Sequence, residues 1–141
     1  MKATELGQRV VKCEHWRWMP GMRALDFSDE EHPARVIDHR CSVVYEDNGG
    51  AIHESVVSRS DVPDLDDPAT LGCLLALVRA ACEPNRAPGD WPMVCTYQSQ
   101  VKKWGVGAWL NESGKATFAA LVLPTFDTEA EALVAALEAA P

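Results

Sequence analysis

The fold is decided by the stretch MVCTYQSQVKKWGVGAWLNESGKATFAALVL, residues 93–123. Three runs within it have the composition of β-strands. These runs are residues 93–100, 104–110 and 116–123. Because Asn111 to Lys115 has the composition of a turn between the last two runs, the stretch predicts an antiparallel meander.

Two segments beside this meander carry helix-start signals. The segment TEAEALVAAL, residues 128–137, opens with Thr128 and Glu131 at the spacing of a capping box. It continues with an apolar stripe of Ala130, Leu133, Val134 and Leu137. A central helix is predicted to begin with Asp67 as N-cap and Pro68 as its first residue, and to end at residues 83–85. Its apolar face consists of Leu71, Leu74, Leu75, Val78 and Cys82.

The first half of the chain is richer in strand signals. Residues 34–46 and 51–58 predict a hairpin around the turn at 47–50, where Asn and Gly supply positive φ angles. Residues 3–13 predict a helix, weakened by Gly7. After it, a short strand that ends at the Pro20–Gly21 turn would hold Trp16 and Trp18 on one face. Three further predictions concern segments without regular structure: an acidic turn at 26–33, an irregular linker at 84–92 and the turn at 111–115.

We therefore expect an α+β fold in which two or three amphipathic helices pack on an antiparallel sheet, as in a layered α/β sandwich. At 141 residues, one domain over residues 1–141 is expected, with a core that forms without disulfides or metal. Residues 26–60 are expected as a hairpin insertion or arm, and the sequence leaves open whether it packs on the sheet or projects. An exposed hairpin edge would allow pairing with a second copy, so a homodimer is also left open.

Charge and composition exclude several classes of protein. Thirteen basic and 21 acidic residues give a net charge of −8, which opposes binding to duplex nucleic acid. The net charge is −2 over residues 1–60 and −6 over residues 61–141. The longest apolar run, Leu71 to Val78, is too short to cross a bilayer, and residues 1–11 lack a secretory signal. Five scattered cysteines fit a reducing compartment, so we expect a cytoplasmic protein.

Three motifs resemble a family of uncharacterised bacteriophage and prophage proteins. They are residues 12–22 (KCEHWRWMPGM), 64–79 (DLDDPATLGCLLALVR) and 128–137 (TEAEALVAAL). The order of central helix, strand pair and Thr-capped final helix also resembles the small phage α/β/α sandwich domain. The resemblance implies a phage origin, the host cytosol as location, and this fold class. It carries no activity and no catalytic residue.

The chemical motifs all have simpler structural interpretations. Cys13-Glu14-His15 and His39-Arg40-Cys41 could offer four zinc ligands, but their spacing is unusual for zinc, so we expect no metal and no cofactor. A thiol nucleophile at Cys73 or Cys95 is disfavoured, because apolar surroundings raise a thiol pKa. Acidic residues before the central helix serve capping and solvation better than Mg²⁺ or Ca²⁺ binding. They are Asp61, Asp64, Asp66 and Asp67.

The tryptophans are the remaining signal, because five Trp against three Phe and two Tyr is many for this length. Gly105 and Gly107 are expected to leave room for Trp109 or a helix. Candidate binding residues are Trp16, Arg17, Trp18, Met22, Trp91, Trp109, Asp61, Asp64 and Asp66.

Two functions follow as hypotheses. The favoured one is a non-enzymatic phage accessory protein that binds a host or phage protein, such as a host-defence component, through an acidic surface bearing tryptophan. The alternative is a small-ligand binder or an enzyme, with a pocket lined by His15, Trp16, Arg17 and Trp18.

Overall fold

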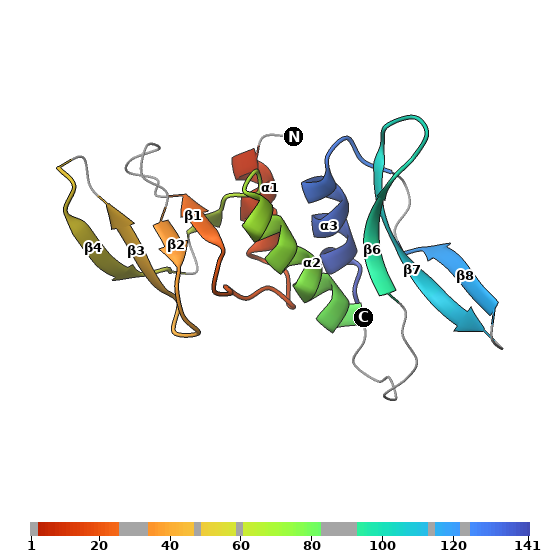
Figure 1. The fold of residues 1–141 in the computed structure, drawn as a ribbon, viewed down its shortest axis with the longest axis horizontal. Coiled ribbons are helices and arrows are strands. Elements are labelled where there is room, and N and C mark those ends of the chain that lie inside the picture. The colour runs from red at the N-terminus through yellow and green to blue at the C-terminus, as the bar shows by residue number, and fades with distance from the viewer. Residues whose placement is uncertain are drawn as a thin grey trace. The chain divides into compact units, whose positions relative to one another are not determined.

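The computed structural model describes residues 3–25, 34–46, 49–58, 61–82, 93–112, 115–121 and 125–141. The chain divides into two compact units, unit 1 from Met1 to Cys73 and unit 2 from Leu74 to Pro141. Helices and antiparallel sheets occur together, which confirms the expected α+β class (Figure 1). No helix among the described residues is long and apolar enough to cross a membrane.

Unit 1 contains a five-stranded antiparallel sheet with the order β4-β3-β2-β1-β5. Its elements are α1 (Ala3–Val10), β1 (Arg23–Leu25), β2 (Ala34–Val36), β3 (Ser42–Glu46), β4 (Ile52–Val56), β5 (Val62–Pro63) and the start of α2 (Pro68–Cys82). The hairpin of β3 and β4 confirms the predicted turn region, where Gly50 has φ +81°. The described part of residues 26–60 therefore supplies three strands of this sheet.

One predicted strand, residues 34–46, is two strands separated by a turn. The Asp38 carboxylate accepts hydrogen bonds from the backbone N–H groups of Arg40 (2.9 Å) and Ser42 (3.0 Å). Cys41 in the same turn has φ +62°. A side-chain acceptor that captures nearby backbone donors competes with the strand ladder, which explains the break.

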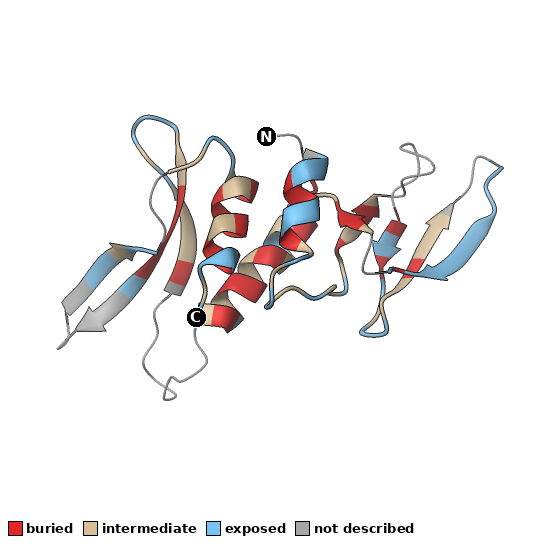
Figure 2. Cartoon of the chain, turned by 180° about the vertical axis from the view of Figure 1, so that it is seen from behind, coloured by how far each residue is buried: buried red, intermediate tan, exposed pale blue. Residues whose placement is uncertain are grey.

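The packing of α1 on β5 gives Gly7 a role that helix propensity does not indicate. Gly7 is buried, and a Cβ atom added there would lie 2.2 Å from Cγ1 of Val62. The absence of a side chain thus lets the helix approach the strand closely. Leu6 and Val10 on the same helix are buried as well. Figure 2 shows the buried and the exposed residues of each helix and strand.

The start of α2 follows its sequence signals. Asp67 accepts hydrogen bonds from the backbone N–H and the hydroxyl of Thr70, both at 2.9 Å, which confirms it as the N-cap. Arg35 on β2 donates to the same carboxylate at 3.1 Å, and Arg23 donates its backbone N–H to the Thr70 hydroxyl at 2.9 Å. Burial raises the pKa of Asp67, but the bonds from Thr70 and Arg35 outweigh it and lower the pKa below its usual value. The cap thereby ties the start of α2, within unit 1, to the sheet of that unit.

Unit 2 contains a three-stranded antiparallel sheet, covered on one face by a helix. Its elements are the rest of α2, β6 (Met93–Gln98), β7 (Trp104–Glu112), β8 (Lys115–Ala120) and α3 (Glu129–Glu138). The order β6-β7-β8 confirms the predicted meander. Val94, Val106 and Ala108 are buried on the face toward α3, and Thr96 donates its hydroxyl proton to Glu129 of that helix.

The capping box of α3 is confirmed, because the Thr128 hydroxyl accepts from the Glu131 N–H and the Glu131 carboxylate accepts from the Thr128 N–H. The predicted stripe of Ala130, Leu133, Val134 and Leu137 is buried. We expected one sheet, whereas the described strands form two. Along the chain, α2 separates the strands of the first sheet from those of the second.

Candidate functional site

Trp16 and Trp18 do not lie on a strand as predicted. Residues 14–19 have no helix or strand structure, because their backbone bonds close turns instead of a ladder. Trp16 donates its backbone N–H to the Cys13 carbonyl at 3.1 Å, and Met22 donates to the Met19 carbonyl at 3.1 Å. This irregular segment connects α1 to β1.

The segment forms one wall of a pocket in unit 1 of about 490 Å³, here called the tryptophan pocket. It is lined by residues 11–14, by Trp16, Arg17 and Trp18, and by Cys41, Val57 and Ser58. Cys41 precedes β3 and Val57 follows β4, and the Val57 N–H donates to the Cys41 carbonyl at 2.9 Å. The far end of the hairpin therefore closes the pocket opposite the tryptophans.

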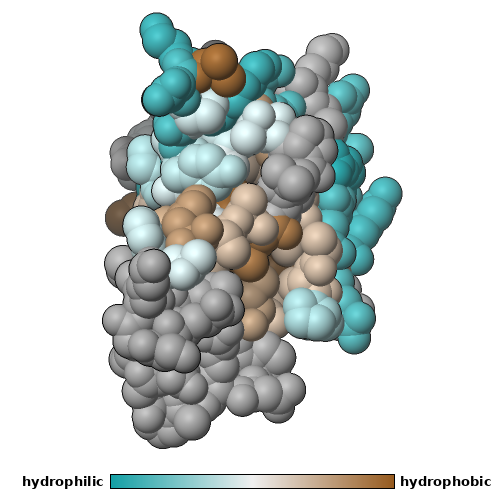
Figure 3. All heavy atoms as spheres, turned by 90° about the vertical axis from the view of Figure 1, so that its right-hand side faces the viewer, coloured by the Kyte–Doolittle hydropathy of each residue, from teal (hydrophilic) through white to brown (hydrophobic). Residues whose placement is uncertain are grey.

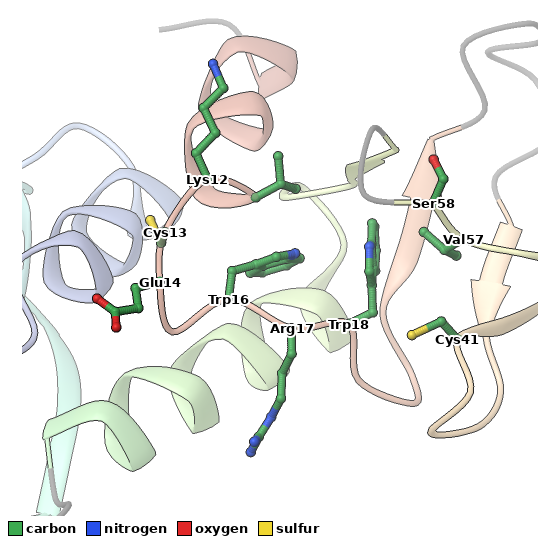
Figure 4. A pocket seen from close by; sticks show the side chains of 10 residues that line it. Lys12, Cys13, Glu14, Trp16, Arg17, Trp18, Cys41, Val57 and Ser58 are labelled. Atoms are coloured by element: carbon green, nitrogen blue, oxygen red, sulfur yellow. The ribbon is translucent and has the colours of Figure 1, made fainter.

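The two tryptophan rings contact each other edge to face, with centroids 5.5 Å apart and planes inclined at 74°. Figure 4 shows the nitrogen-bearing end of the Trp16 ring directed at the ring of Trp18. The indole nitrogen of Trp18 is buried and has no hydrogen-bond partner. Among the buried side-chain nitrogen and oxygen atoms of the described residues, it is the one donor left without an acceptor.

Charged side chains surround the tryptophan pocket at its solvent side. Lys12, Glu14 and Arg17 are exposed, and in Figure 4 Lys12 and Arg17 extend on opposite sides of the Trp16 ring. His15, which we predicted in the lining, is not part of it. Cys41, Val57 and Ser58 are lining residues that the sequence analysis missed, because no local pattern connects them to residues 11–18.

A second candidate surface is the face of the three-stranded sheet that points away from α3. Tyr97, Trp109 and Phe118 lie there, one on each strand, and we call this surface the aromatic face. Phe118 contacts Tyr97 and Trp109 edge to face, each with a centroid distance of 5.2 Å. Trp109 is 44% exposed and Phe118 is 36% exposed.

Two glycines of β7 make this arrangement possible. A Cβ atom at Gly105 would lie 2.5 Å from the Tyr97 ring, and one at Gly107 would lie 2.2 Å from the Phe118 ring. The open strand face thus admits aromatic side chains from the neighbouring strands, not Trp109 or a helix as predicted. Neither Tyr97 nor Phe118 had been singled out from the sequence, because their meeting depends on the strand register.

The side of the molecule that carries β8 has both apolar and hydrophilic surface. Figure 3 views the molecule from the side of β8 in Figure 1 and shows a band of apolar surface next to hydrophilic areas. Leu121, just after β8, is also exposed (40%), but its backbone pairs with Val106, so by strand alternation it belongs to the opposite face. Among the described side chains on the aromatic face, none is charged.

The other predicted binding residues have structural roles or lie elsewhere. Met22 is fully buried in unit 1, so it packs in the core and does not face a partner. Asp61 accepts from the Ser58 N–H at 2.7 Å, and Asp64 accepts from the Asp66 N–H at 3.1 Å. Asp64 also pairs with Arg23 at 3.6 Å. Trp91 lies outside the described residues.

The cysteines and histidines do not assemble into a site in the described part of the chain. No group of three or more His, Cys, Asp or Glu side chains that could hold a metal is found among those residues. Burial raises the pKa of the Cys73 thiol, and the charge of Asp67 raises it further, as the sequence predicted for a thiol on this helix. Comparison of the chain with protein-family models, with curated proteins and with solved structures finds no match.

Proposed function

We propose that the protein acts by binding another protein, and that the aromatic face of unit 2 is the contact surface. The exposed, mutually packed rings of Trp109 and Phe118 carry this proposal. Trp and Tyr are enriched at binding hot spots, because they bury a large area with few rotatable bonds. Rings already held by their neighbours lose little conformational entropy on binding.

The absence of charge on the described part of this face favours a protein over a nucleic acid as partner. Aromatic platforms for single strands combine stacking rings with Lys or Arg for the phosphates. Of the two lysines in the β6–β7 turn, Lys103 is paired with Asp127. The net charge of −8 acts against a nucleic acid as well.

The wider function proposed from the sequence is a non-enzymatic phage accessory protein with a host or phage partner. It rests on the resemblance of three motifs and on the acidic composition. Inhibition of a host-defence component and a location in the host cytosol belong to the same proposal.

Site-specific photo-crosslinking tests the contact surface. Phe118 is replaced by p-benzoylphenylalanine in the cells that produce the protein, and Gln100, an exposed residue in the β6–β7 turn, is replaced in the control. We expect a discrete crosslinked protein from position 118 that is lost when Trp109→Ala is added, and none from position 100.

Two results would contradict the proposal. One is the same product pattern from positions 118 and 100. The other is a product of twice the chain mass of 15.4 kDa, which would assign the aromatic face to a homodimer. Trp109→Ala must keep its melting temperature, because a residue that is 44% exposed contributes little to the core.

A further inference from the structure

The buried indole N–H of Trp18 is the starting point, because it is a donor without an acceptor. A buried polar group without a partner destabilises the folded state, and such groups are rare in folded proteins. The donor belongs to a side chain that lines a pocket of about 490 Å³. A ligand that brings an acceptor atom into this pocket would supply the hydrogen bond that the Trp18 N–H lacks.

Access to this nitrogen requires a small movement of the side chains around it. Trp16 is the neighbour best able to move, since it is partly exposed and lies on a segment without helix or strand structure. Cys41 and Val57 line the pocket on the side of the Trp18 ring that is away from Trp16. A ligand would therefore displace or stack on Trp16 and reach Trp18.

The shape and charge of the pocket restrict the chemical class of ligand further. Trp16 offers a flat ring surface, which favours a flat ring on the ligand. A cation would suit the two rings, but it has no acceptor for the Trp18 N–H. Lys12 and Arg17 outnumber Glu14 at the solvent side, so an anionic group is favoured there. The volume fits one small molecule.

We propose that the tryptophan pocket binds a small planar aromatic anion, either a carboxylate or a phosphate ester. The ring lies against Trp16, an oxygen of the ligand accepts the Trp18 N–H, and Lys12 balances the negative charge. This site is independent of the aromatic face, because it uses residues of unit 1 only.

Calorimetry with defined probes tests the ligand class on the full chain. Indole-3-acetate represents an aromatic carboxylate and adenosine monophosphate represents a phosphate ester. Cyclohexylacetate carries the charge without a flat ring, and adenosine carries a flat ring without the charge. We expect at least one planar anion to bind, and both controls to bind more weakly.

Variants then assign the contacts. Trp18→Phe keeps a ring and removes the donor, and should weaken binding about fivefold, the value of one hydrogen bond. Lys12→Gln should weaken it about two- to fivefold, less at high salt. Lys102→Gln, in the β6–β7 turn of unit 2, makes the same charge change at a residue that does not line the pocket and should leave binding unchanged.

A measurement on the unaltered protein keeps the test decisive if Trp18→Phe fails to fold. The Trp18 indole N–H gives its own signal in a ¹H–¹⁵N spectrum, and bound probe should shift it more than the signal of Trp109. Absence of binding by both planar anions would overturn the proposal. Equal binding of cyclohexylacetate, or a Trp18 signal that does not move, would overturn it too.

Discussion

Gly107→Ala tests the packing that creates the aromatic face. An added Cβ would lie 2.2 Å from Cζ of Phe118 and 2.9 Å from the backbone oxygen of Ala119. The ring could move, but the strand oxygen cannot move without disturbing the β7–β8 ladder. Overpacking of this kind costs about 1–3 kcal/mol, and replacing glycine in a strand returns roughly 0.5–1 kcal/mol. The net loss is centred on about 1 kcal/mol and reaches at most about 2.5 kcal/mol, which for 141 residues corresponds to about 3–8 °C in melting temperature.

Gly105→Ala is the matched control two residues away. The three atoms nearest to its added Cβ all belong to the outer part of the Tyr97 side chain, at 2.5–2.7 Å. A side chain that is partly exposed can rotate away, so this variant should stay within about 0.5 kcal/mol of the original protein. Urea unfolding followed by circular dichroism measures both variants.

A double-mutant cycle with Phe118→Ala isolates the ring contact. Removing the ring should reduce the cost of Gly107→Ala, while the contact with the Ala119 oxygen keeps part of it. The reasoning would be refuted if Gly107→Ala were as stable as the original protein. It would also be refuted if Phe118→Ala left the cost of Gly107→Ala unchanged.

Three further predictions concern the helices. Gly72→Ala should stabilise the protein by about 1 kcal/mol, seen as a higher melting temperature, because Gly72 is exposed within α2 and an added Cβ meets nothing within 4 Å. Asp67→Ala should cost about 1–2 kcal/mol at neutral pH through loss of the N-cap and the Arg35 bond. The pKa of Asp67 is lower in the folded state than in the unfolded state, so its negative charge stabilises the fold. This stabilisation is complete above the unfolded-state pKa of about 4, and it is lost as the pH falls through the folded-state pKa. Urea unfolding from neutral pH to about pH 2.5 should show that the difference in unfolding free energy between the original protein and Asp67→Ala narrows as the pH falls. A constant difference would contradict this. Thr128→Ala should cost about 1 kcal/mol in thermal melts and Thr128→Ser much less, since serine keeps the capping oxygen.

Local signals explain what the sequence could predict. The N-cap at Asp67 and the capping box at Thr128 each depend on residues a few positions apart. Such signals decide where elements begin and end. The α+β class followed from them without any knowledge of long-range contacts.

Contacts between distant residues explain what the sequence could not predict. The spacing of Trp16 and Trp18 suits a strand, but a strand forms only where another strand pairs with it. The pairing with β2 and β5 begins at β1, which follows these two residues in the chain. The pocket is closed by Cys41 and Val57, whose positions depend on the β3–β4 hairpin. Gly105 and Gly107 did indicate an open strand face. The identity of the rings that fill it depends on register, which no local pattern fixes.

In the sequence alone, the high number of tryptophans is a single sign of binding. In the structure, the described tryptophans lie in different environments. Trp104 is partly buried and its backbone pairs with Phe126, so it contributes to unit 2 itself. The Trp18 ring can be buried without a polar partner, but its buried N–H is a donor without an acceptor. Only a molecule that enters the pocket supplies that acceptor. Trp109 presents a partly exposed ring that Phe118 holds in place. Because Trp18 and Trp109 belong to different units, a variant at one should leave binding at the other intact, and this separation lets each proposal fail alone.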